Sequence, residues 1–151
     1  MKRWIRLLAA AAMGLLLILP HTALAASQSG QYLPDYADTI VREVNLERAK
    51  VGLAPLTVDP ELTAAARIRA REIVQRMGHT RPDGSSWRTV SAKAFGENIS
   101  YGRTDPDRAM AGWMGSPGHK ANILRKSFGS TGVACYRAGN GRYYWVQLFG
   151  R

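Results

Sequence analysis

The clearest periodicity in the chain predicts an amphipathic helix that begins at Asp59-Pro60 and stops at Gly78. Its apolar positions recur at spacings of four, four, three and four residues, at Leu62, Ala66, Ala70, Ile73 and Met77. This is the period of a single helix face, and an aspartate followed by proline is a typical helix start. The opposite face carries several arginines, and we interpret it as a solvated surface rather than a contact with nucleic acid.

Helical patterns also occur before and after this segment. A helix is expected from Asp35 to Gly52, with apolar residues on one side and charged residues, including Arg48, on the rest of its surface. A short helix is expected around residues 87–90. Another begins at Asp105-Pro106, breaks at Gly115 and restarts at Ser116-Pro117, where the serine is expected to be the N-cap.

Three stretches have the composition of strands. They are residues 95–101, 130–136 and 143–149, and the last two are joined by Asn140-Gly141, a strong hairpin signal. An antiparallel sheet of about three strands needs helices to cover its faces, and four helical segments are available. The predicted fold class is therefore α+β, with helices on both sides of a small sheet.

The first 25 residues have the pattern of a secretory signal peptide. A basic start is followed by an apolar run from Leu7 to Leu19 and by Ala23-Leu24-Ala25, an A-x-A cleavage site. The apolar run is too short for a membrane span, so no transmembrane anchor is expected. We predict a secreted, extracytoplasmic protein with a flexible leader at residues 26–34 and one domain at residues 35–151, acting as a monomer.

Charge and cysteine content narrow the possible partners. Without the three basic residues of the signal, 18 basic residues face 11 acidic residues, a net charge of +7. Such an excess favours anionic surroundings, although a basic surface that only aids solubility is the competing interpretation. Cys135 is the only cysteine, so no internal disulfide can form, and its apolar neighbours predict a buried thiol.

Two histidines remain after the signal, His79 in a loop and His119 just inside a helix. Asn122 stands three residues after His119 on the same helix face. Together with Glu97, the two histidines make a reasonable zinc set, with water as the fourth ligand. The alternative is that each histidine is a hydrogen-bonded structural group. Serine and cysteine nucleophiles receive little support, because no nucleophile-elbow motif is present.

Several motifs in order resemble the CAP superfamily, which includes cysteine-rich secretory proteins, antigen 5 and plant pathogenesis-related proteins and is also called the SCP domain. The motifs are Val44-Asn45-Leu46-Glu47-Arg48, His79 with Pro82-Asp83-Gly84, Gly96-Glu97-Asn98-Ile99, Trp113 with Ser116, His119 with Asn122-Ile123-Leu124, and Tyr144-Trp145-Val146-Gln147-Leu148-Phe149-Gly150. The form with Ser116-Pro117-Gly118-His119 is similar to the bacterial branch. The resemblance implies an α-β-α sandwich.

The resemblance also implies a central cleft, which eukaryotic members line with two histidines and two glutamates and in which some members bind zinc. His79 and Glu97 match this pattern, whereas Ser116 stands where the second glutamate is expected and Tyr144 where the second histidine is expected. His119 belongs to the bacterial motif. The expected cleft residues are therefore His79, Glu97, Ser116, His119, Asn122 and Tyr144, with His79, Glu97 and His119 as candidate ligands of a divalent cation such as zinc.

Two functions follow from these observations. The first is a non-enzymatic binding module whose cleft engages a cell-envelope polymer, a lipid or a protein, with no specific binding of nucleic acid. The second is a metal-dependent hydrolase in which zinc activates a water molecule at the same cleft. A third possibility is a structural wall protein without a used cleft. The motifs contain few acidic residues, and this shortage favours the binding module over the hydrolase.

Overall fold

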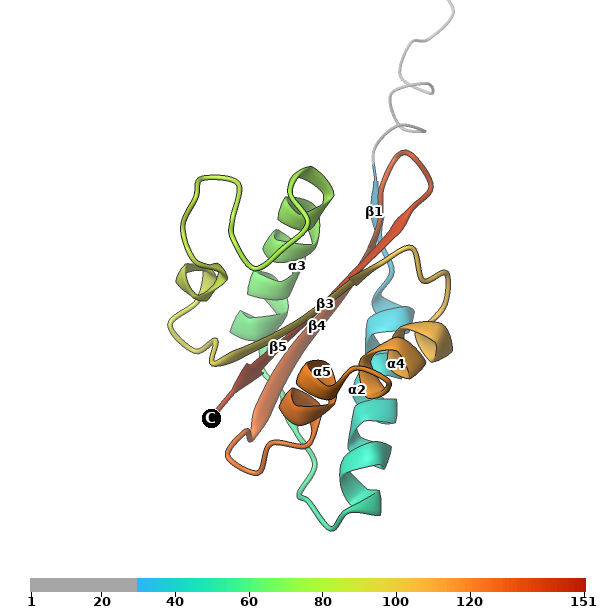
Figure 1. Cartoon of the computed structure of the whole chain (residues 1–151), viewed down its shortest axis with the longest axis vertical. Coiled ribbons are helices and arrows are strands. Elements are labelled where there is room, and N and C mark those ends of the chain that lie inside the picture. The colour runs from blue at the N-terminus through green and yellow to red at the C-terminus, as the bar shows by residue number, and fades with distance from the viewer. Residues whose placement is uncertain (1–29) are drawn as a thin grey trace, which may run out of the picture.

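Three long strands cross the centre of the molecule, and helices lie on both of their faces (Figure 1). The computed structural model describes residues 30–151, so the predicted signal peptide and most of the predicted leader lie outside the described residues. The elements in order are β1 (Gln31–Tyr32), α2 (Pro34–Lys50), β2 (Thr57–Val58), α3 (Pro60–Gln75), the 3-10 helix η1 (Trp87–Val90), β3 (Gly96–Tyr101), α4 (Pro106–Met114), α5 (Pro117–Ile123), β4 (Ser130–Arg137) and β5 (Tyr143–Gly150).

The sheet has five strands, in the order β1-β4-β5-β3, with β2 also pairing with β4. The three long strands are antiparallel neighbours, as predicted. The estimate of about three strands missed β1 and β2, because two-residue strands carry no periodicity. Gln31 and Tyr32, which were expected in a flexible leader, pair with Arg137 and Tyr136 of β4.

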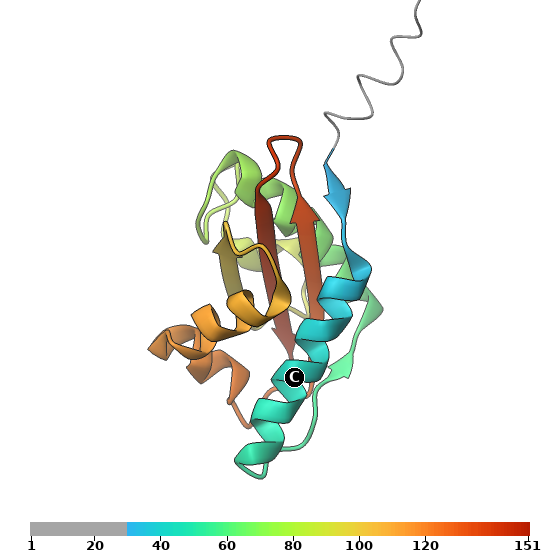
Figure 2. The ribbon, with the colours of Figure 1, turned by 90° about the vertical axis from the view of Figure 1, so that its right-hand side faces the viewer.

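Two apolar clusters fill the spaces between the sheet and the helices. One lies between the sheet and α3 and includes Leu62, Ala66, Ile73 and Leu148. The other lies between the sheet and α2, α4 and α5 and includes Trp113 and other side chains of both layers. Figure 2 shows α2 running along the side of the sheet, on the same face as α4 and α5. The α-β-α sandwich predicted from the sequence is thus confirmed.

Helix termini follow the predicted signals with two exceptions. The Asp59 side chain accepts hydrogen bonds from the backbone N–H groups of Glu61 and Leu62, as a good N-cap does. Ser116 occupies the N-cap position of α5, as predicted. Its hydroxyl makes no capping hydrogen bond, however, so the prediction that its side chain caps the helix is wrong. Helix α3 ends at Gln75, which leaves Met77 beyond the helix and 43% exposed.

Among residues 30–151, none of the helices combines the length and hydrophobicity of a membrane span.

Arg48 was expected on the solvated side of its helix but is only 1% exposed. Its guanidinium donates hydrogen bonds to four backbone carbonyls, those of Ala54, Ile123, Arg125 and Phe128, at 2.8–3.1 Å. The residue therefore ties the end of α2 to the linker before β2 and to the connection between α5 and β4. Burial lowers the pKa of the guanidinium, because it disfavours the charged form.

Candidate functional site

The edge strand β3 presents neighbouring polar side chains to opposite faces of the sheet. Glu97 faces α3, where it meets Arg69. Asn98 faces α5, where its amide donates to the carbonyl oxygen of His119 at 3.1 Å. Asn122 of α5 donates in turn to the side-chain oxygen of Asn98 and to the backbone oxygen of Glu97. Because side chains alternate along a strand, this one edge positions polar groups on both sides of the sheet.

Glu97 is held by two partners on the α3 side. Arg69 donates from Nε to Oε1 at 2.7 Å, and Nδ1 of His79 lies 2.7 Å from Oε2. The carboxylate and the guanidinium are both buried. Such a carboxylate needs charged hydrogen-bond donors to compensate for lost solvation, and Arg69 supplies them. Glu97 is therefore a positioning group for His79.

Arg69 also organises the loop that follows α3. It donates to Glu72 and to the carbonyl oxygen of Gly78, each at 2.8 Å. Glu72 in turn accepts from Arg81 at 2.6 Å. Burial tends to raise the pKa of Glu72, but the hydrogen bonds from Arg81 and Arg69 outweigh it and the pKa is lowered. This chain of charges fixes the loop that carries His79.

The hydrogen bond to Glu97 determines which ring nitrogen of His79 is available to another partner. A carboxylate accepts hydrogen bonds, so Nδ1 carries the hydrogen and Nε2 is left for another partner. The His79 side chain is 54% exposed. Its Nε2 atom is thus an available polar atom at the protein surface.

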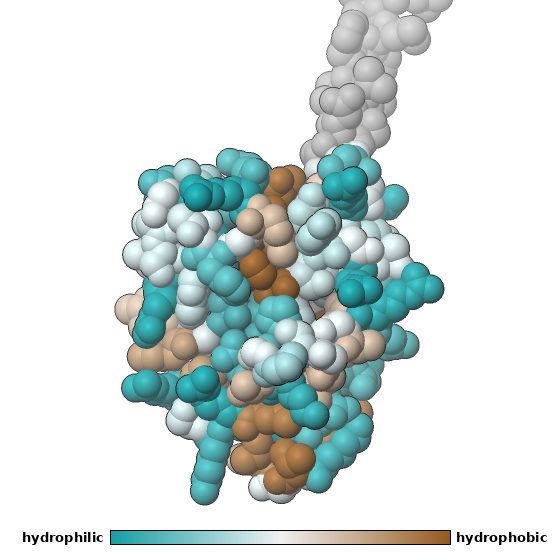
Figure 3. Space-filling view, in the orientation of Figure 1, coloured by the Kyte–Doolittle hydropathy of each residue, from teal (hydrophilic) through white to brown (hydrophobic). Residues whose placement is uncertain are grey.

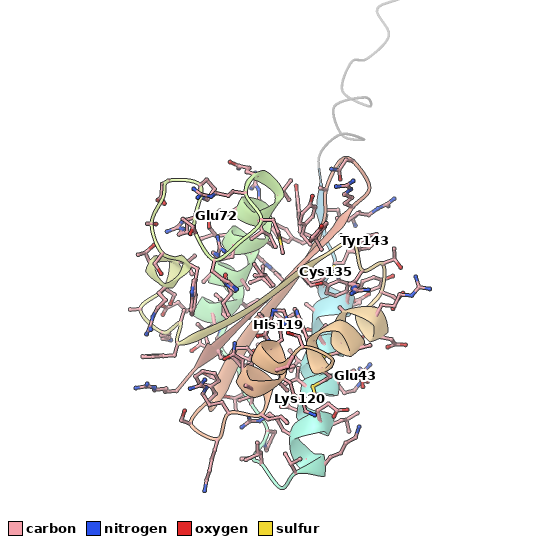
Figure 4. All side chains as sticks on the ribbon, in the orientation of Figure 1. Glu43, Glu72, His119, Lys120, Cys135 and Tyr143 are labelled. Carbon is pink, nitrogen blue, oxygen red and sulfur yellow. The ribbon has the colours of Figure 1, made fainter. Side chains whose placement is uncertain are left out.

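His119 lies on the other side of the same strand edge and close to His79. Figure 4 shows it on α5 beside β3, with Glu72 on the opposite side of the strand. Burial lowers the pKa of His119, and electrostatic repulsion by His79 lowers it further. Its Nδ1 atom is buried and has no hydrogen-bond partner within residues 30–151. Buried polar atoms are nearly always paired with protein or with water, so this nitrogen is open to a hydrogen bond from a water molecule or a ligand.

The lowered pKa of His119 predicts a dependence of stability on pH. Between the lowered folded pKa and the ordinary value near 6.5, the unfolded chain binds more protons than the folded one. The free energy of unfolding should therefore fall as pH drops through this range. In His119→Gln the fall should be smaller, as measured by denaturant unfolding at pH 7.5, 6.5 and 5.5. Parallel curves for the two proteins would contradict the prediction.

The structure brings some of the predicted site residues together. His79, Glu97, His119 and Asn122 meet at the β3 edge, and we call this group the histidine site. Of the three predicted metal ligands, Glu97 is already bound to Arg69 and His79, whereas His119 keeps a ring nitrogen without a partner in the described residues. Across residues 30–151, no three His, Cys, Asp or Glu side chains are grouped to hold an ion.

Tyr144 does not belong to the histidine site. It is 6% exposed in the cluster beneath α3 and stacks on Tyr101, with ring centroids 6.4 Å apart. Leu148 is the residue that pairs with Glu97, and Tyr144 lies four residues along the strand, about 13 Å away at strand spacing. Tyr144 was expected among the cleft residues, and the structure places it in the apolar cluster under α3 instead.

Arg69 and Asn98 were not predicted from the sequence. The sequence did contain a signal that Arg69 is buried. Arg69 stands three residues after Ala66 and directly before Ala70, so it lies on the apolar stripe of α3. An arginine on a buried stripe requires hydrogen-bond acceptors, such as a carboxylate or backbone carbonyls. Asn98 gave no comparable signal, since its role depends on the packing of α5 against β3.

His79 is exposed at the surface of the histidine site, whereas Glu97 and Nδ1 of His119 are buried. In Figure 3 a strip of hydrophobic surface lies between the α3 side and the α4–α5 side and is flanked by hydrophilic groups. A cavity of about 60 Å³ between α2 and α3 and one of about 350 Å³ near the end of α2 are lined by other residues. Cys135 lines the smaller cavity, and burial raises the pKa of its thiol to about 12, as expected for an inert structural cysteine.

Comparisons with known proteins agree with the fold and the motifs. The model of the cysteine-rich secretory protein family, CAP, matches residues 41–149. The uncharacterized protein YkwD of Bacillus subtilis is 34% identical over 122 residues, which are 76% of this chain and 46% of that protein. The chain thus spans about half the length of this relative.

Two solved bacterial structures share the fold. An outer surface protein of Borrelia burgdorferi superposes with a TM-score of 0.71 at 20% identity, over 81% of this chain and 98% of that one. An extracellular protein of Bacillus anthracis that contains an SCP domain superposes with a TM-score of 0.70 at 23% identity, over 78% of this chain and 41% of that one. With the family model covering most of the chain and a bacterial relative 34% identical, the protein belongs to the CAP superfamily and is of the bacterial type.

Proposed function

We propose that the histidine site is the binding site of a secreted, non-enzymatic CAP module that engages a cell-envelope polymer, a lipid or a protein. The observation that carries the proposal is the buried Nδ1 atom of His119, which lacks a hydrogen-bond partner in the described residues. A ligand that supplies the missing partner would recover a hydrogen bond at an atom already removed from water. Nε2 of His79 offers a second contact nearby.

The chemistry around the site supports binding over hydrolysis. Glu97 is bound to Arg69 and His79, so it is not available to activate a water molecule. No serine hydroxyl in residues 30–151 is hydrogen-bonded to either histidine, and Cys135 is buried with a raised pKa. The site therefore lacks an activated serine or cysteine nucleophile, and the only available bases are the imidazoles themselves.

The test is capture by isolated cell-envelope fractions and by lipid vesicles at moderate salt. Wild-type protein should be retained by one of these materials, and His119→Gln should lose about tenfold in affinity through one lost ligand hydrogen bond. Lys120→Gln is the matched control, because Lys120 is the exposed neighbour of His119 on the same helix. Equal capture of all three proteins would reject the histidine site as the binding surface.

A site organised by a divalent cation is the second candidate. Glu97 holds His79 through Nδ1, which is how carboxylates orient histidines that bind metal through Nε2. The residues present fit two imidazole ligands, from His79 and His119, but not the three protein ligands of a catalytic zinc site. Zinc calorimetry on wild type and His79→Gln tests this candidate. Heat that appears only with the wild type, and capture that is lost in chelator, would favour a cation-dependent module.

A further inference from the structure

A cavity of about 350 Å³ lies at the end of the sheet where α2 and β5 finish. Residues 52–55 of the linker before β2 form one wall, and residues 126–129 before β4 form another. These segments meet at the lower end of the molecule in Figure 1. The volume falls in the range of about 300–1,000 Å³ that is typical of ligand pockets. None of the histidine-site residues lines it.

The charged residues that line this cavity are all cationic. They are Arg48, Lys126 and Arg151, and no aspartate or glutamate accompanies them. Ser127 and Phe128 complete the wall. A concave surface with charges of one sign concentrates ions of the opposite sign. We call this feature the basic cavity.

Arg48 places a buried positive charge in the wall of the basic cavity. Its guanidinium has five N–H donors, and carbonyl oxygens accept four hydrogen bonds from it. Among the ion pairs of residues 30–151, none includes Arg48. Buried charges are normally paired, whereas this one is stabilised by carbonyl dipoles alone and leaves a net positive charge in the cavity wall.

Aromatic rings hold further arginines in place at the same end of the molecule. The guanidinium of Arg151 lies 4.4 Å from the ring centre of Phe95, and that of Arg125 lies 5.3 Å from the ring centre of Phe128. Neither arginine forms an ion pair with an acidic side chain in the described residues. A guanidinium already held by a ring loses less entropy when it binds an anion.

We propose that the basic cavity binds phosphate groups of an anionic polymer. Phosphate offers several acceptor oxygens and matches the geometry of guanidinium donors. The cavity is large enough for a phosphate with part of the unit that carries it. This site is independent of the histidine site, so either proposal can fail alone.

The test uses linear polyphosphate as the probe, with calorimetry at about 50 mM salt. Lys126→Gln combined with Arg151→Gln should weaken binding by about tenfold or more, because two phosphate contacts are lost. Both residues are exposed, so the fold should be retained, which circular dichroism checks. The matched control is Arg76→Gln with Arg142→Gln, two exposed arginines toward the opposite end of the sheet. It removes the same charge and should change affinity by less than about twofold.

Three further measurements separate a built site from general charge attraction. Amide NMR shifts on adding polyphosphate should concentrate at residues 51–55 and 125–129 and at Arg151, and inorganic phosphate should compete. Polyglutamate of matched charge should bind several-fold more weakly. Equal losses in the two double variants, shifts spread over the basic surface, or equally tight polyglutamate would each overturn the proposal.

Discussion

A single methyl group at position 132 is expected to reduce the free energy of unfolding by at least about 3 kcal/mol. Gly132 of β4 lies against the first turn of α3, and a Cβ atom there would overlap the carbonyl carbon of Leu62 and the backbone nitrogen of Thr63. These are backbone atoms, which cannot rotate away as the end of a flexible side chain can. Gly132→Ala therefore forces α3 away from the sheet and opens the cluster around Leu62, which is fully buried. Denaturant unfolding measures the loss.

Gly118→Ala is the matched control for this experiment. Gly118 lies in α5, and a Cβ atom there would meet no atom within 4 Å. The same substitution should be neutral or stabilise by about 0.5–1 kcal/mol, because alanine is the better helix former. If Gly132→Ala lost less than about 1 kcal/mol, the close approach of α3 to β4 would be wrong.

The second large effect is expected at Arg69, where methionine should reduce the free energy of unfolding by about 3–5 kcal/mol. The substitution leaves the carboxylate of Glu97, whose residue is 4% exposed, without its buried cation. His79 is more than half exposed and cannot replace the guanidinium. Arg69 also donates to Gly78, so the loop that carries His79 should become more mobile. Unfolding measurements and amide hydrogen exchange of residues 78–81 test both expectations.

A double variant separates the ion pair from general damage to α3. Adding Glu97→Gln to Arg69→Met removes the stranded charge, so the double variant should lose less stability than the two single losses combined, by about 1 kcal/mol or more. Arg76→Met is the surface control, because Arg76 is exposed and follows the helix, and it should change stability by less than about 0.5 kcal/mol. Strict additivity would show that Arg69 and Glu97 are not energetically coupled.

The buried arginines show where reasoning from periodicity succeeds and where it fails. The stripe from Leu62 to Ile73 predicted α3 correctly, because apolar residues at helical spacing must face a core. Polarity alone placed Arg48 on the solvated side of α2, yet it is buried. A long polar side chain can be buried wherever carbonyls or carboxylates satisfy its donors, and those partners lie far away in the chain.

The histidine site was also only partly predictable from the sequence. The sequence identified three candidates, His79, Glu97 and His119. Each is a residue type that can bind ligands, and each stands next to a turn, a glycine or a helix start. Their contacts were not predictable, since no residue near Glu97 in the chain indicates that its carboxylate is bound to Arg69. Tyr144 was misplaced because its position along β5 depends on the register between β3 and β5.

The order of helices and strands predicted the α+β class, and a series of motifs along the whole chain resembled the family to which it belongs. Local chemistry by itself determined the helix starts at Asp59 and Asp105 and the hairpin at Asn140-Gly141. These depend on a few neighbouring residues or on one period of side chains, which the chain displays in order. Only the tertiary structure decided that Glu97 faces Arg69 while His119 lies on the other side of the strand, and that Arg48 lies in the wall of a basic cavity. Those outcomes depend on strand register and helix packing, which bring together residues dozens of positions apart.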